Sequence, residues 1–321
     1  MENSLNTAYD DAFRTMIEKC DDLVFPMLNY MFGEHYGNGD QIIRGSNEEF
    51  SQQDGGRLKK RITDSQLVIL SGGERKRYHI ECESSTKAEG VLVRIFEYGS
   101  QIALDDAILS CDEFRLVVNY PRAGVLFLRN STNVPDKMTI EIRTPDGKTC
   151  DYSVSVIREN DFTLDDMFDK ELYFLLPFYL FQYEDELPRL NADQVYLQSL
   201  LDEYDGIADR LNELVEAGKL SSRSRYVIIQ MIKRVSDKLA MAQEHVRQKV
   251  GDVMGGHVID LDIFQAEDKA KAEGIIIFIE DKREDGIGED IIKQKLIKHF
   301  KLTNDEADAY LKKEIDKVVM G

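Results

Sequence analysis

The sequence predicts an α/β protein in which a mixed β-sheet is flanked by helices and followed by a helical C-terminal part. A two-residue periodicity begins at Arg61, with a buried apolar run at 66–70 and an alternating stretch at 77–84, and two further apolar stretches lie at 114–120 and 124–129. Such stretches are typical of strands. A helical repeat separates the first two stretches from the last two. Strand, strand, helix and strand in this order indicate a mixed sheet with helices on its faces.

Composition places the chain among ordinary globular proteins. Its 321 residues are 42% apolar and 31% charged, and a chain of this length usually forms more than one domain. No run approaches the ~20 apolar residues of a membrane helix, and the first residues resemble no targeting peptide, so we expect a cytoplasmic protein without a membrane partner. Four cysteines without a C-x-x-C pair indicate reduced thiols and no zinc cage.

The net charge of −19 argues against a protein that binds nucleic acid over its whole surface. The charge is uneven, however, because residues 57–94 hold nine Lys/Arg and five Asp/Glu, a local charge of +4. This window is either a basic island that attracts a phosphate backbone or two solvated charged loops.

Residues 7–32 are predicted to form a helix, with apolar residues at Phe13, Met16, Ile17 and Cys20. A capping-box pattern covers residues 7–10. Pro26 predicts a kink or restart near residues 21–22. Residues 33–56 are predicted to form a polar loop.

The middle of the chain alternates between predicted strands and helices. We expect strands at 66–70, 77–84, 114–120 and 124–129 that form a small sheet, with a hairpin turn at 71–74 and a helix at 90–107. Residues 138–157 are a second predicted hairpin around Asp146-Gly147, and the apolar segment 171–187 is expected to pack on the core.

Two amphipathic stripes, at residues 197–214 and 227–242, predict a long helical hairpin with Gly218 between its helices. Such stripes indicate packing within one chain or a homo-oligomer. We therefore expect a core at 1–188, a helical hairpin at 189–265 and a small helical module at 266–321, to which residues 269–286 connect.

The predicted strand RYHIECES holds the most informative acidic residues. Because alternate strand residues face opposite sides, Ile80 and Cys82 can enter the core while His79, Glu81 and Glu83 share the other face. Two carboxylates this close repel each other unless water or a cation compensates them. The alternative is that both glutamates line a solvated strand face.

Asp64 starts the preceding strand, so the spacing D-x16-E-x-E can bring three carboxylates to one site. Oxygen ligands suit Mg²⁺ or Mn²⁺ rather than zinc. A bound ion of this kind can activate water for attack on phosphorus.

The helix at 90–107 adds a polar stripe of Arg94, Tyr98 and Gln101, side chains that can bind phosphate oxygens. Arg94 can instead form a salt bridge with Glu97 or Glu89. His79 either assists proton transfer or is an ordinary hydrogen-bonded histidine.

Four segments in this order resemble the Rpn-type recombination-promoting nucleases, which are labelled PD-(D/E)XK nuclease family transposases. The segments are YDDAFRTM (9–16), RITDSQLVI (61–69), HIECESS (79–85) and VRIFEYGSQIAL (93–104). The resemblance covers roughly the first 185 residues and, more loosely, the helical tail. It implies a restriction-endonuclease-like α-β-β-β-α-β core and magnesium-dependent cleavage of DNA.

The resemblance also implies residue roles. The motif aspartate falls on Asp64 and the acidic residue of the (D/E)-x-K element on Glu81. Glu83 stands where lysine is usual, although related members carry glutamine there, and Lys87 or Arg94 are candidates to supply the missing positive charge. The N-terminal acidic residue of the family falls on Asp10, which otherwise closes the capping box with Thr7.

The resulting hypothesis is a metal-dependent DNA endonuclease. Catalysis and metal binding are assigned to Asp64, Glu81 and Glu83, with Asp10, His79 and Lys87 as accessory candidates. The expected DNA-binding residues are Arg57, Lys59, Lys60, Arg61, Arg94, Tyr98 and Gln101. The rival hypotheses are a catalytically inactive nuclease fold that binds DNA or protein, and a protein whose helical tail dominates as an oligomerisation or partner-binding arm.

Overall fold

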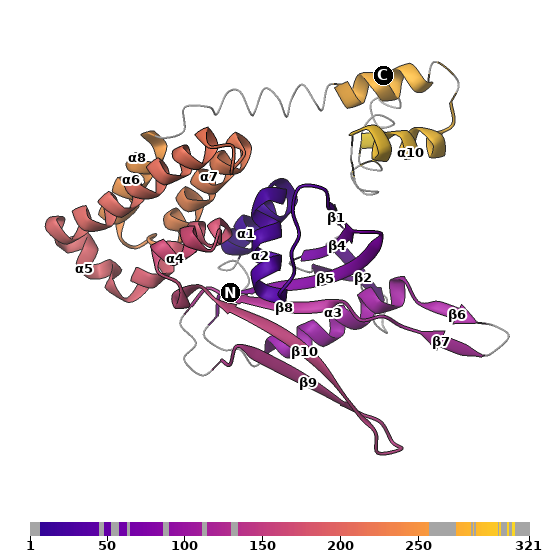
Figure 1. Ribbon diagram of the computed structural model, residues 1–321. Helices are drawn as coiled ribbons and strands as arrows, with labels where there is room; N and C mark the ends of the chain where they lie inside the picture. The colour runs from indigo at the N-terminus through magenta and orange to yellow at the C-terminus, as the bar shows by residue number, and fades with distance from the viewer. Residues whose placement is uncertain are drawn as a thin grey trace. The chain divides into compact units, whose positions relative to one another are not determined.

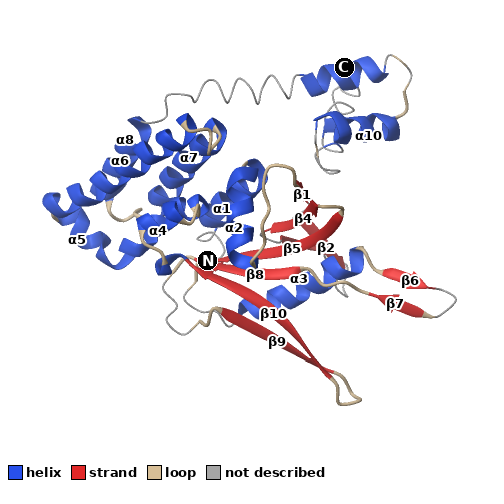
Figure 2. Ribbon diagram, viewed as in Figure 1, coloured by secondary structure: helices blue, strands red, loops and turns tan. Residues whose placement is uncertain are grey.

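The computed structural model divides the chain into two compact units, Met1–Ile42 with Asn47–Ile259 and Ile43–Ser46 with Asp260–Gly321. The residues that it describes are 7–44, 48–52, 58–62, 65–85, 90–110, 114–129, 134–256, 274–283, 285, 287–300, 302, 307 and 310–311. Helices and strands of the first unit are coloured separately in Figure 2. Among the described residues, no helix combines the length and apolar character needed to cross a membrane.

A six-stranded mixed sheet forms the centre of the first unit, in the order β1-β4-β5-β8-β10-β9. Its strands are β1 (Gln41–Arg44), β4 (Ser65–Ser71), β5 (Glu74–Glu83), β8 (Arg122–Phe127), β9 (Lys137–Arg143) and β10 (Thr149–Arg158). β5, β8 and β10 are parallel neighbours, whereas β4 and β9 pair antiparallel with β5 and β10. The predicted α/β class with a mixed sheet is confirmed.

The two faces of this sheet have different cover (Figure 1). Helix α3 (Val91–Asp105) connects β5 to the parallel strand β8, and its residues Val91 and Ile95 pack with Val125 and Phe127 of β8. The opposite face packs on α1 (Thr7–Lys19) and α2 (Asp21–Phe32), through side chains that include Ile80. Residues of β5 therefore reach a different layer according to whether their number is odd or even.

Local sequence signals explain the helix break and the turns. The predicted restart appears at Cys20, between α1 and α2. The turn between β4 and β5 uses Gly72 and Gly73, both with positive φ, a backbone region that glycine enters without steric cost. Gly147 has the same property between β9 and β10. Both predicted hairpins are confirmed.

The helical segments after the sheet complete the first unit. They are η2 (Glu159–Asp161), α4 (Leu164–Asp169), the 3₁₀ helix η3 (Tyr173–Glu186), α5 (Leu187–Ala192), α6 (Gln194–Glu216), α7 (Ser222–Leu239) and α8 (Glu244–Gly256). Phe174 and Phe178 of η3 are fully buried, so the apolar segment packs on the core as predicted. The apolar stripes of α6 and α7 join the same buried cluster, whereas a homo-oligomer through these helices stays a prediction.

Two predictions about individual segments are wrong. The expected loop 33–56 contains β1 and also β2 (Glu48–Gln52), which pairs with β3 (Leu58–Ile62) in a separate sheet. The expected strand 114–120 does not enter the main sheet, because β7 (Arg115–Val117) pairs with β6 (Ile108–Ser110) instead. Periodicity identifies extended segments but not their partners.

The second unit contains helices at residues 274–283 and α10 (Glu289–Phe300). Its small core includes Ile275, Ile279, Ile292 and Leu296. Residues 274–283 therefore belong to the core of this module, although the sequence suggested only a connection there. The sequence did not predict this helix because its amphipathic repeat is short and is followed directly by acidic residues and glycines.

Candidate functional site

The candidate site lies where the second half of β5 meets the start of α3. Tyr78, Ile80 and Cys82 belong to the core cluster with α1 and α2. Glu81 and Glu83 pair with Val125 and Phe127 of β8, whose side chains pack on the α3 side of the sheet. The predicted alternation along this strand is therefore confirmed.

Both glutamates are buried, which excludes the solvated strand face as the reason for their spacing. Glu81 is 3% exposed, Glu83 is 5% exposed and His79 is fully buried. Ionised carboxylates removed from water need a charged or hydrogen-bonding partner. The surroundings of Glu81 and Glu83 provide such partners for every carboxylate oxygen.

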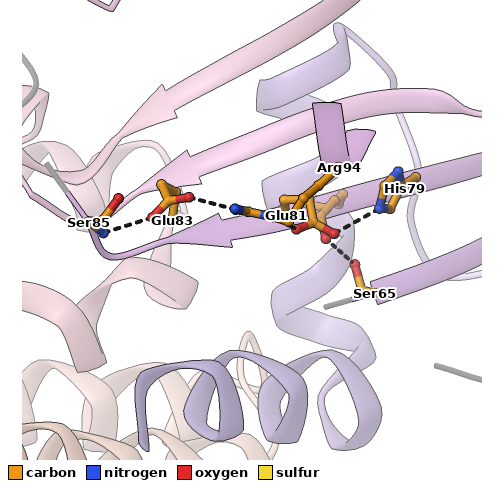
Figure 3. Close-up of polar contacts among 7 residues, drawn as sticks. Ser65, His79, Glu81, Glu83, Ser85 and Arg94 are labelled. Atoms are coloured by element: carbon orange, nitrogen blue, oxygen red, sulfur yellow. Dashed lines mark hydrogen bonds and ion pairs between the residues drawn. The ribbon is translucent and has the colours of Figure 1, made fainter. Parts of the chain in front are cut away.

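Glu81 interacts with side chains on both sides of it. Its Oε1 lies 2.9 Å from Nε2 of His79, and its Oε2 accepts a hydrogen bond from Nε of Arg94 at 3.2 Å (Figure 3). Burial raises the pKa of Glu81, but the contacts with His79 and Arg94 outweigh it and hold the pKa below its usual value. Glu81 is thus an anion inside the protein.

Glu83 is held by Arg94 and by the backbone that leaves β5. Nη2 of Arg94 donates to Oε2 of Glu83 at 2.6 Å, and the backbone N–H of Ser85 donates to Oε1 at 2.8 Å. One guanidinium therefore bridges two buried carboxylates, as Figure 3 shows. Burial lowers the pKa of Arg94, yet the two glutamates raise it overall, so Arg94 stays cationic.

One ring nitrogen of His79 has no partner among the described residues. Its Nδ1 is buried and makes no hydrogen bond with them, while the ring meets the edge of Tyr98 with centroids 5.9 Å apart. Unsatisfied buried polar atoms are rare in folded proteins and often mark the place of a water or ligand. His79 is therefore a member of the site rather than a surface residue.

Asp10 of α1 is coupled to the same site by charge. Burial raises its pKa to about 6; Arg14 opposes this shift, and Asp11, Glu81 and Glu83 add to it. The pKa of Asp10 consequently depends on the charge of Glu81 and Glu83. Its predicted capping box lies outside the described residues because the side chain of Thr7 does.

Several predicted residues cannot be placed at the site. Asp64, Arg57 and Lys87 lie outside the described residues. Lys59, Lys60 and Arg61 belong to β3, and their side chains also lie outside the described part of the structure. Arg94 is at the site, Tyr98 contacts His79, and Gln101 is exposed on α3. Arg94 binds Glu81 and Glu83, and Glu89, one of the predicted alternatives, lies outside the described residues.

Two partners of the site were missed by sequence reasoning. Ser65 opens β4, pairs with Ile80, and donates from its hydroxyl to the Ile80 carbonyl oxygen. Arg129 donates to the carbonyl oxygen of Ser84 and forms a bidentate ion pair with Glu184 of η3. The available signal was an arginine directly after an apolar strand, which alone does not specify a partner.

The donor set fits a divalent cation in chemistry but is incomplete among the described residues. Glu81 and Glu83 offer oxygen atoms of the kind that Mg²⁺ and Mn²⁺ prefer. No group of three or more His, Cys, Asp or Glu side chains that could hold a metal occurs in the described part of the chain. Asp64, the predicted third carboxylate, lies outside the described residues.

Comparison with protein-family models, with curated proteins and with solved structures found no significant match. The site must therefore be interpreted from its own geometry and chemistry.

Proposed function

We propose that the first compact unit is a metal-dependent DNA endonuclease with a PD-(D/E)XK core. The observation that carries the proposal is the buried pair Glu81 and Glu83, two carboxylates that share one cationic partner on the α3 face of β5. Keeping two anions out of water is costly, and a cation-binding role explains the arrangement.

The order of elements supports the proposed core. Counting only the strands of the main sheet, helix α2 is followed by β1, β4, β5, the crossover helix α3 and the parallel strand β8, with the hairpins β2-β3 and β6-β7 inserted. These strands are neighbours in the order β1-β4-β5-β8. The succession agrees with the α-β-β-β-α-β core that the resemblance implies. The acidic pair lies at the end of the third strand of that succession, where the (D/E)-x-K element is expected.

In this proposal Glu81 and Glu83, with Asp64, hold Mg²⁺ or Mn²⁺. Such an ion, when bound, supplies a more acidic water and stabilises negative charge on phosphate oxygens. His79 orients Glu81 through its 2.9 Å contact. The basic residues Arg57, Lys59, Lys60 and Arg61 are assigned to the phosphate backbone, and we propose a cytoplasmic location.

Nicking of supercoiled plasmid tests this function. The full chain with Mg²⁺ or Mn²⁺ should nick the plasmid, and Glu81→Gln and Asp64→Asn should each abolish nicking. Glu141→Gln is the matched control, since Glu141 is a strand glutamate paired with an arginine, Arg143, at the surface. Equal nicking by the wild type and both site variants would refute the assignment.

A second candidate is a catalytically inactive nuclease fold that binds DNA or protein. It is favoured by Arg94, which gives both glutamates a cationic partner without a metal, and by Glu83 in the place of the usual lysine. If the protein binds DNA but does not nick it with either Mg²⁺ or Mn²⁺, this candidate would be supported over the endonuclease.

A further inference from the structure

We propose that Arg94 is an exchangeable counter-ion that occupies the cation position of the Glu81 and Glu83 pair, so that binding of the guanidinium and of a divalent metal exclude each other. The inference rests on the proposed function and adds the means by which the site is opened. It assigns to Arg94 a positioning and regulatory role rather than direct contact with the reacting atoms.

The contacts of Arg94 show why the two cations compete. Its Nε and Nη2 lie 3.2 and 2.6 Å from Oε2 of Glu81 and Oε2 of Glu83. The other oxygen of each carboxylate is occupied by His79 and by the Ser85 backbone. A divalent ion needs carboxylate oxygens at ~2.0–2.6 Å, which requires the space between the two Oε2 atoms that the guanidinium fills.

Exposure shows which partner can move. The Arg94 side chain is 38% exposed, whereas those of Glu81 and Glu83 are 4% and 6% exposed. Arg94 lies in the first turn of α3, on a long side chain that can rotate into solvent without movement of the helix. The two glutamates are fixed on a strand between β4 and β8.

Electrostatics requires some cation at the pair at all times. Leaving two buried carboxylates without a positive partner is strongly destabilising, so Arg94 should leave only when another cation enters. A second, independent observation is the buried Nδ1 of His79, for which the described residues offer no hydrogen-bond partner. Such an atom usually has a bound water or ion, and the same ring contacts Glu81 through its other nitrogen, Nε2. Once displaced, Arg94 keeps its charge and is available to a phosphate group.

Calorimetric titration with Mn²⁺ alone tests the exchange in the full chain. Arg94→Met removes the competing guanidinium and should bind Mn²⁺ at least about tenfold more tightly than the wild type. Its thermal midpoint without metal should be lower, and Mn²⁺ should restore it. The matched control is Arg158→Met, since Arg158 also bridges two carboxylates, Asp136 and Asp161, away from the site; its Mn²⁺ affinity should equal that of the wild type.

Each other outcome has a distinct meaning. The exchange would be overturned if Arg94→Met binds Mn²⁺ as tightly as the wild type or more weakly. In that case the nuclease proposal would still stand if Glu81→Gln abolishes Mn²⁺ binding. No Mn²⁺ binding by either protein would overturn both. If Arg94→Met does not fold, Arg94→Lys is used instead, because its single ammonium group cannot contact both glutamates as the guanidinium does. A Mn²⁺ affinity of Arg94→Lys no higher than that of the wild type would again overturn the exchange.

Discussion

His79 and Glu81 face each other in the protein interior, with Nε2 of the histidine 2.9 Å from Oε1 of the glutamate. His79→Leu places an apolar side chain of moderate size at this position and removes the N–H donor to Glu81. We expect a loss of about 1–3 kcal/mol in the free energy of unfolding, because a buried carboxylate oxygen is left unsatisfied. Urea titration at pH 7 measures the change, and His35→Leu, at an exposed position, should change stability by less than about 0.5 kcal/mol. Equal effects of the two variants would contradict the buried pair.

Asp10 makes the stability of the metal-free protein depend on pH. Its folded pKa is raised to about 6 from an ordinary value of 3.8, mainly by burial. A raised carboxyl pKa favours the folded state fully below the unfolded pKa, and this contribution is lost as pH rises through the folded pKa. Between pH 4 and pH 7 the wild type should therefore lose stability relative to Asp10→Asn, by about 1–2 kcal/mol after allowance for partial solvent screening.

Urea unfolding at pH 4 and pH 7 with a chelator present measures this difference. Asp151→Asn, an exposed strand position, should follow the wild type at both pH values. A profile for Asp10→Asn that is parallel to the wild type would show that Asp10 does not titrate in this range.

Glu159 is a second buried carboxyl with a raised pKa, and it lies outside the candidate site. One of its oxygens accepts a hydrogen bond from Gln182 at 2.8 Å, and the other has no partner in the part of the chain that the structure describes. Burial raises its pKa well above the usual value, and the hydrogen bond from Gln182 only partly opposes this. The protonated form is thus the one that the fold accommodates.

Glu159→Gln should consequently stabilise the protein by about 1–2 kcal/mol at pH 8 and much less at pH 5. The sign follows from the raised pKa of Glu159. The protonated carboxyl favours the folded state at low pH, and this contribution is lost as pH rises above the usual pKa of a glutamate. Glu141→Gln, at the surface, is the control. An identical effect of Glu159→Gln at both pH values would contradict a neutral buried carboxyl.

Local signals determined how much of the fold was predictable. The turn at Gly72 and Gly73 was predictable because positive φ strongly favours glycine. Helix α3 was predictable from its own apolar spacing. β1 was not, because Gln41–Arg44 is a short edge strand with only half-buried or exposed residues, and edge strands are specified by their neighbour more than by their own alternation.

The candidate site divides in the same way. That Glu81 and Glu83 share a face follows from strand geometry and was predicted. Their burial was not, because it depends on Arg94, which reaches both glutamates from α3, 13 and 11 residues further along the chain. A crossover helix determines that contact, and no spacing rule within one segment describes it.

The packing of α2 on the sheet gives a last prediction. A Cβ added at Gly124 of β8 would lie 2.2 Å from Sδ of Met31 and 3.0 Å from Cζ of Phe32. Gly124→Ala should therefore destabilise the protein by about 1 kcal/mol, since overpacking forces the side chains of Met31 and Phe32 to shift. Gly206→Ala in α6 is the matched control, because nothing lies within 4 Å of its added Cβ; alanine is the better helix former there and should stabilise by about 0.5–1 kcal/mol. Urea titration measures the change in the free energy of unfolding for both variants. Changes of opposite sign would establish that the close approach of β8 to α2, rather than the loss of a glycine, causes the effect. Stabilisation by both substitutions would contradict this packing.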